Sequence, residues 1–391
     1  MAAAPSVPGA EAVRAAQQRV RQSPQRPDAW LALGRAWGRV ARETGDPGFT
    51  LAVEACAQEV LAREPESAQA LGLLALALTS QHRFAEARDR ARAALQSDPD
   101  DLVSLGALAD ALIELGDIDG AEGATQRMLD LKPSLPAYAR AAHLRWLRGD
   151  SAGAKVLYRH AIDSGWDARD REPTAWALVQ AAMVFWHGGD YEGAEAGCDL
   201  ALRWLESYPA GLACKGRAAL SAGRSAEAAT LLARSLRAAP LVETAWLLAN
   251  ARREAGDEVG AAAADAEALR IGRATDGLQL AALLASRRLH LDEALRRLEV
   301  ERKTRSGGAL DDALAWALFR VGRIPEAEVA AERALRTGTR DARILYHGGA
   351  IALAAGRTEA GRALIADALA LNPAFDTVEA REARELLRAQ P

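Results

Sequence analysis

The sequence predicts an all-α protein, an α-solenoid of about ten helix–turn–helix units. Pro65, Pro99 and Pro133 are evenly spaced, about 34 residues apart, and each interval encloses two short helical patterns. Glycines that end the first pattern of a unit recur with a similar period, at Gly116, Gly149, Gly189, Gly223, Gly256, Gly322 and Gly356. Their positions differ by 33, 40, 34, 33, 66 and 34. Such a period indicates units that bury their apolar faces against their neighbours.

The unit between Pro99 and Pro133 shows why each half forms a helix. The first helix has one apolar face with the spacing i, i+3, i+4 and i+7, formed by Leu105, Leu108, Ala109 and Leu112. Gly116 ends this helix because glycine adopts the left-handed conformation at little steric cost. Asp117 or Asp119 then caps the second helix, whose inner face contains Ala121, Thr125 and Met128. Pro133 stops the second helix because proline cannot continue the hydrogen-bond ladder.

The recurring prolines and glycines divide the chain into four parts. We expect residues 1–10 to be disordered, since they are mostly small and include two prolines. A capping helix is expected over residues 11–26 and the repeat array over residues 27–373. A second amphipathic capping helix is expected over residues 374–391. Its Glu and Arg residues suit a face that meets water at the open end of an array.

The period is interrupted in three places. Residues 43–49 and residues 164–173 form insertions that contain Gly, Pro and polar residues. The interval between Gly256 and Gly322 is twice the usual one, and Leu289 stands where a glycine is expected. One unit therefore lies in this interval, with helices predicted over residues 278–288 and 292–302.

Composition and charge argue against two classes of partner. The chain has 391 residues and a net charge of -4, so no strong field favours nucleic acid or an anionic membrane. No window approaches the roughly 20 apolar residues that a membrane helix requires.

The first residues lack the basic stretch and apolar core of a signal peptide, which predicts a cytoplasmic protein. The alternative is an exported, periplasmic protein in which Met1 replaces a removed signal peptide.

Few residues are candidates for metal or redox chemistry. Cys56, Cys198 and Cys214 are an odd and sparse set without C-x-x-C spacing. We therefore expect them to be buried small apolar residues and not a disulfide framework or zinc site. His143, His160 and His187 lie in different predicted helices without H-E-x-x-H spacing. The sequence thus predicts no metal, no cofactor and no enzymatic activity.

One set of residues is shared with a known family. Trp30, Leu33, Gly34 and Trp37 follow the pattern W-x2-L-G-x2-Y, with Trp37 in the place of Tyr. With the recurring frames, residues 30–373 resemble the tetratricopeptide-repeat superfamily. Residues 138–150, 313–323 and 345–356 are similar to those of its bacterial multi-repeat members. The resemblance implies a right-handed superhelix, a concave face made by the first helix of each unit, and protein or peptide partners.

The groove positions that the family implies are the second, fifth, ninth and twelfth of each first helix, and here they are rich in aromatic and basic residues. The predicted groove residues, including His187 beside one such position, are His143, Trp146, Trp176, Met183, Trp186, His187, Arg217, Trp246, Asn250, Arg253, Trp316, Phe319 and Tyr346. Trp, Tyr and Arg often dominate interfaces, but a Trp at helical spacing also packs between repeats.

These groove residues support two hypotheses about function. The first is a non-enzymatic scaffold or adaptor that binds a protein or peptide in the concave groove. The second is a regulatory receptor whose superhelix binds a small peptide or other ligand. Family members that bind C-terminal carboxylates place Lys, Arg and Asn on successive first helices. Here the comparable places hold Gly106, Asp110, Ala139, His143, Val179 and Met183. This departure argues against binding of chaperone tails.

Overall fold

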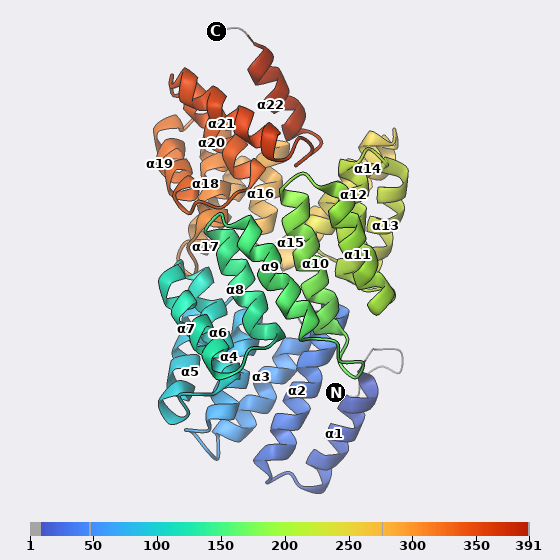
Figure 1. Cartoon of the computed structure of the whole chain (residues 1–391), viewed down its shortest axis with the longest axis vertical. Helices are drawn as coiled ribbons and strands as arrows, with labels where there is room; N and C mark the ends of the chain where they lie inside the picture. The colour runs from blue at the N-terminus through green and yellow to red at the C-terminus, as the bar shows by residue number, and fades with distance from the viewer. Residues whose placement is uncertain (1–8, 47, 276, 390–391) are drawn as a thin grey trace. The chain divides into compact units, whose positions relative to one another are not determined.

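The computed structural model describes residues 9–46, 48–275 and 277–389, and in these ranges the chain is all-helical, with 22 helices (Figure 1). Disorder predicted for residues 1–10 falls almost wholly outside the described residues. The chain divides into two compact units, Met1–Leu144 and Arg145–Pro391, and the boundary falls within α8. The division into capping helices and array proposed from the sequence stays a prediction.

Helices α2 to α21 form ten successive pairs, which agrees with the expected number of repeats. The helices of the first unit, with α8 shared, are α1 (Ala10–Gln22), α2 (Pro27–Thr44), α3 (Gly48–Leu61), α4 (Ala68–Ser80), α5 (Phe84–Ser97), α6 (Leu102–Glu114), α7 (Ile118–Leu131) and α8 (Leu135–Leu147).

The second unit contains fourteen further helices among its described residues. They are α9 (Ser151–Asp163), α10 (Glu172–His187), α11 (Tyr191–Trp204), α12 (Pro209–Ser221), α13 (Ser225–Ala238), α14 (Val242–Glu254), α15 (Glu258–Ala274), α16 (Gly277–Arg287), α17 (Leu291–Glu301), α18 (Gly308–Arg320), α19 (Ile324–Arg336), α20 (Ala342–Ala354), α21 (Thr358–Leu371) and α22 (Glu379–Arg388).

Where the turn inside a repeat carries one of the recurring glycines, it is built as the sequence indicates. Gly116 has a φ of 78° between α6 and α7, in the left-handed region that favours glycine. The Asp117 carboxylate accepts a hydrogen bond from the Gly120 N–H at 2.9 Å and so caps α7. The same cap recurs at the start of other second helices, at Asp150, Asp190 and Asp257.

The repeat predicted between Gly256 and Gly322, where Leu289 stands in place of a glycine, is present. Helices α16 and α17 lie within one residue of the predicted ranges. In the turn between them, Arg288 and His290 have positive φ values of 56° and 45°. The chain therefore reverses here at the cost of two side chains held in a conformation that glycine adopts more easily.

All three cysteines are buried, as expected, but the expectation that none forms a disulfide is wrong. Cys198 in α11 and Cys214 in α12 form a disulfide, with Cα atoms 5.8 Å apart, and Cys56 is free and buried. The two cysteines are 16 residues apart in sequence and lie on helices that pack against each other. Counting cysteines and searching for short motifs could not reveal a pair that only helix packing brings together.

None of the described helices combines the length and the apolar character that a membrane span would need.

Candidate functional site

The first helices of the repeats in the second unit are crossed by a later part of the same chain. We call residues 372–388 the C-terminal segment; it enters as non-helical chain and continues as α22, beside α20 and α21 (Figure 1). At α10, Asn372 Nδ2 donates a hydrogen bond to the main-chain oxygen of Trp186 at 2.8 Å. At α12, Ser221 Oγ donates to the main-chain oxygen of Ala374 at 3.1 Å. The segment thus binds two successive first helices, each time through a hydrogen bond between a side chain and a main-chain oxygen.

Further along, the segment presents carboxylates to the next first helices. At α14, Asn250 Nδ2 donates to Asp376 Oδ2 at 3.3 Å. At α16, Ser286 Oγ donates to Glu379 Oε1 at 2.6 Å. Glu379 is only 1% exposed, so its charge is recognised inside the protein and not at the surface.

Glu382 has three partners on the earlier helices. Arg288 next to α16 and Arg320 of α18 lie 3.1 Å and 3.0 Å from its two oxygens. The Tyr346 hydroxyl of α20 donates to the same carboxylate at 2.9 Å. Burial and the Glu382 charge together raise the pKa of Tyr346, so the phenol stays protonated and remains a donor.

His347 of α20 lies at the centre of this polar network. Its Nδ1 is 2.9 Å from Asp312 of α18, its Nε2 is 3.4 Å from Glu379, and its ring stacks on Trp316 with centroids 3.9 Å apart. Burial opposes the charged imidazole, but Asp312 and Glu379 outweigh it and raise the pKa of His347 to about 9. The imidazolium in turn overcomes the effect of burial on Glu379 and lowers its pKa to about 2.

Arg343 completes the set of basic groups beneath the segment. Its guanidinium lies 3.5 Å from Glu379 and 3.8 Å from Asp376, and it covers the Trp246 ring at 4.9 Å from the centroid. Burial works against the charged guanidinium, but Glu379 and Asp376 dominate and raise the pKa of Arg343.

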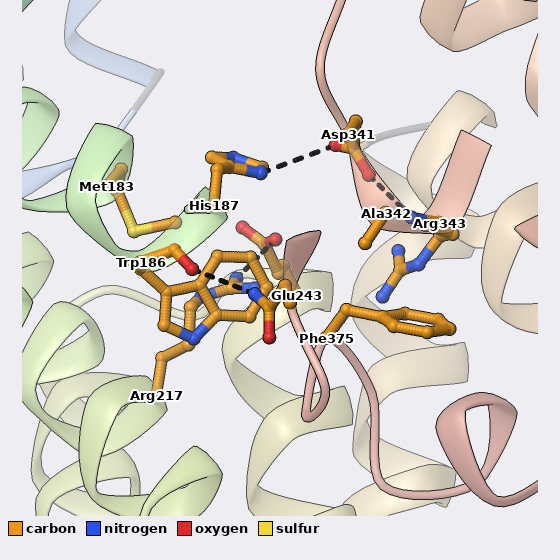
Figure 2. Close-up of a pocket in the computed structure, with 10 residues that line it drawn as sticks. Met183, Trp186, His187, Arg217, Glu243, Asp341, Ala342, Arg343 and Phe375 are labelled. Atoms are coloured by element: carbon orange, nitrogen blue, oxygen red, sulfur yellow. Dashed lines mark hydrogen bonds and ion pairs between the residues drawn. The ribbon is translucent and has the colours of Figure 1, made fainter. Parts of the chain in front are cut away.

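A pocket with a volume of about 100 Å³ opens beside the start of the segment. Figure 2 shows Met183, Trp186 and His187 of α10 on one side and Asp341, Ala342 and Arg343 on the other. The remaining lining residues are Arg217, Glu243, Asn372 and Phe375. The pocket is therefore bounded by α10, α12, α14, the start of α20 and the C-terminal segment.

One ion pair and one imidazole–carboxylate contact line this pocket. Arg217 is 2.5 Å from Glu243, and His187 Nδ1 is 3.5 Å from Asp341 and aligned toward it (Figure 2). Burial is the largest influence on His187 and lowers its pKa, which Asp341 only partly opposes, so the imidazole is neutral at pH 7. Arg217 lowers the pKa of Glu243. The pocket thus offers both a cation and an anion to a small ligand.

The structure gathers most of the predicted groove residues, and these lie in the second unit. Met183, Trp186, His187 and Arg217 share the pocket. Beneath the C-terminal segment lie Trp246, Asn250, Trp316 and Tyr346. Two others support their neighbours from the side: Trp146 packs on His187 and Phe319 stacks on Trp316.

Three predicted groove residues remain. Arg253 pairs with Asp265 of the same repeat at 2.7 Å. Trp176 in α10 is 37% exposed. His143 belongs to the first unit, where burial lowers its pKa. No partner contact tests any of these assignments, so they stay predictions.

The repeat period does not point to the residues that face the groove from the later part of the chain. They are Asp341, Arg343, Asn372, Phe375, Asp376, Glu379 and Glu382. One signal was available: Asp376, Glu379 and Glu382 are spaced by three residues, which places carboxylates on one side of a helical segment. Among the described residues, no group of three or more His, Cys, Asp and Glu side chains is arranged to hold a metal ion.

Stacked helix pairs whose first helices line a shared surface define a helical-repeat protein. Two family models, both described as tetratricopeptide repeat, match residues 35–101 and 78–143. Residues 35–143 thus consist of tetratricopeptide repeats, and consecutive helix pairs continue along the described chain to α21.

Several solved structures are similar to this chain at low sequence identity. A human IFIT1 dimer with PPP-AAAA has a TM-score of 0.55 and 16% identity, over 83% of this chain and 77% of that one. PilW, a type IV pilus biogenesis factor, gives 0.45 and 16%, over 56% and 98%. Yeast Tom70 gives 0.43 and 13%, over 97% and 96%. No curated protein sequence matches the chain. At these identities the likeness concerns the fold alone.

Proposed function

We propose that this protein is a non-catalytic scaffold that binds a segment of a partner protein on the surface formed by its first helices. One observation carries the proposal: in the second unit, this surface already holds a peptide segment, the chain's own residues 372–388. Tetratricopeptide repeats generally serve as protein-interaction scaffolds, which agrees with this use of the surface. A preformed surface loses little entropy on binding.

The scaffold proposal is tested by photo-crosslinking in the native cell. A photoreactive amino acid replaces Trp176, which is 37% exposed on the first helix α10, or Val259, which is 85% exposed on the second helix α15. We expect a protein crosslinked from position 176 and little or none from position 259. Equal crosslinking from both positions, or none from position 176, would contradict the proposal.

The pocket beside α10 supports a second candidate function, a receptor for a small ligand. Arg217 and Arg343 offer cations, Glu243 and Asp341 offer anions, and Phe375 offers an apolar wall. This chemistry suits a small zwitterion such as an amino acid or dipeptide. A bound ligand stabilises the folded state by mass action, so the melting temperature of the wild type should rise with such a compound. The folded Arg217→Gln variant should lose the shift, and an unresponsive wild type across a panel of amino acids and dipeptides would count against this function.

A further inference from the structure

We propose that the C-terminal segment is an internal ligand, and that the surface beneath it accepts an acidic segment of a partner protein in its place. The inference rests on the proposed scaffold function and specifies the partner by its chemistry: carboxylates spaced by three residues, at the junction of non-helical chain and a short helix.

The contacts of the segment define this chemistry. The carboxylates of Asp376, Glu379 and Glu382 all point to the array, where cationic and hydrogen-bonding groups receive them. These groups are Asn250, Ser286, Arg288, Arg320, Arg343, Tyr346 and His347. Hydrogen bonds to charged groups are stronger than neutral ones, so the surface selects for carboxylates at these positions. In one ion pair the segment supplies the cation and the array the anion, since Arg381 lies 3.0 Å from Glu254. This reversed pair fixes the direction in which the segment runs along the surface.

The way the segment is held favours exchange. Its buried apolar side chains are few, mainly Phe375, Ala380 and Ala383. Its charged pairs gain Coulomb energy but lose hydration, so their net contribution is small. Helix α22 has ten residues, and helices this short are marginal on their own. Its helicity therefore depends on being bound, as for a peptide that folds on a surface.

Several donors of the surface are not fully used by the segment. Within the described part of the chain, the Nε atoms of Arg287 and Arg320 are buried and make no hydrogen bond. His347 Nε2 also makes none, although it lies 3.4 Å from Glu379. A buried unsatisfied donor is costly. A partner whose carboxylates reach these atoms would therefore bind better than the internal segment.

The test uses a fluorescein-labelled synthetic peptide of residues 372–388, whose binding to the full-length protein is followed by fluorescence anisotropy. In the wild type the tethered segment competes at a high effective concentration. Glu382→Lys places a cation against Arg288 and Arg320 and should expel the tethered segment. The matched control is Glu385→Lys, since Glu385 is exposed on the same helix. Circular dichroism verifies the fold of every variant.

We expect the Glu382→Lys variant to bind the peptide at least tenfold more tightly than the wild type, and Glu385→Lys to bind like the wild type. A peptide with Gln in place of Glu379 and Glu382 should bind at least tenfold more weakly to the opened variant. Equal peptide binding by wild type and a folded Glu382→Lys variant would overturn the inference.

If Glu382→Lys does not fold, the conservative Glu382→Gln variant replaces it in the same assay. Loss of fold in Glu382→Gln would also overturn the inference, because a displaceable segment cannot be essential for folding. The two proposals remain separable in these experiments. Crosslinking from position 176 without peptide exchange would keep the scaffold function and remove the internal ligand. Peptide exchange without any crosslinked protein would remove the scaffold function.

Discussion

Trp316 is the largest side chain that the second unit buries almost completely, with 1% exposed. It stacks on His347 and Phe319, and the Arg320 guanidinium covers its ring at 4.1 Å from the centroid. Its role in this structure is therefore packing beneath the C-terminal segment, and a partner can reach it only after the segment leaves.

Trp316→Ala should lower the free energy of unfolding by about 3–5 kcal/mol, the usual cost of truncating a buried aromatic side chain. The measurement is urea denaturation followed by circular dichroism. Trp176→Ala is the control, since Trp176 is 37% exposed, and it should cost much less. Similar losses for the two variants would show that Trp316 is not packed as described.

The buried pair of His347 and Glu379 should make the free energy of unfolding decrease both toward alkaline and toward acidic pH. The pKa of His347 is about 9 in the folded protein against an ordinary 6.5. Its contribution is therefore complete below about pH 6.5 and is lost as the pH rises through about 9. The pKa of Glu379 is about 2 against an ordinary 4.5, so its contribution is present above about pH 4.5 and is lost as the pH falls toward 2.

His347→Gln should reduce the free energy of unfolding at pH 6 and flatten its decline between pH 6.5 and 9. The reason is that the neutral amide cannot compensate Asp312 and Glu379 at any pH. Urea denaturation at a series of pH values measures both effects. The exposed His160 gives the control variant His160→Gln, which should keep the wild-type profile. An unchanged alkaline decline in His347→Gln would contradict the assignment.

The disulfide between α11 and α12 links two elements that also pack together. It closes a loop of 16 residues, and constraint of the unfolded chain by such a loop stabilises a protein by about 3 kcal/mol. The double variant Cys198→Ser/Cys214→Ser should unfold at a lower urea concentration by a corresponding amount. Alkylation of the unfolded, unreduced protein should modify one cysteine, Cys56, and alkylation after reduction should modify three. Three modified cysteines without reduction would exclude the disulfide.

The local sequence pattern was sufficient to predict the helices, but it was insufficient to predict which distant segments they contact. Helices α16 and α17 were predictable from spacing alone, because a repeat needs its neighbours on both sides to bury its face. The helix at residues 379–388 was also predictable, but not its docking. Amphipathicity shows that a helix has a polar face and cannot show that this face meets Arg288, Arg320 and His347.

For the predicted groove residues as well, the local pattern predicts position but not long-range contacts. Their positions on first helices follow from the repeat period. Burial of Trp316 and Tyr346 by a later segment does not follow from it. The carboxylate of Glu379 has its partners in two different earlier repeats, at His347 and at Ser286. The period of the repeats does not encode contacts of that kind.

The second unit contains contacts between distant repeats, which an ordinary repeat array lacks. Repeat proteins are held together mainly by contacts between neighbouring repeats. Here Tyr191 donates to Asn372 at 2.6 Å across 181 residues, and Ser221 donates to Ala374 across 153 residues. The Thr339 hydroxyl also reaches the main-chain oxygen of Leu147, 192 residues away. The second unit therefore curves back on itself and joins its early and late repeats.

A variant at Asn372 tests whether these long-range hydrogen bonds couple the early and late repeats of the second unit. Its amide donates to the main-chain oxygen of Trp186, its side-chain oxygen accepts from Tyr191, and it is buried. Asn372→Ala should remove one of the two hydrogen bonds to the Trp186 main-chain oxygen, which keeps the one from the Gly189 N–H. It should also leave the Tyr191 O–H without its acceptor, at a total cost of about 1–3 kcal/mol. Hydrogen exchange should then quicken in the turn between α10 and α11 as well as near position 372. The control Asp367→Ala alters an exposed residue of α21 and should change neither. Faster exchange confined to the neighbourhood of position 372 would mean that each repeat is stabilised only by its neighbours, so release of the C-terminal segment would leave α10 unaffected.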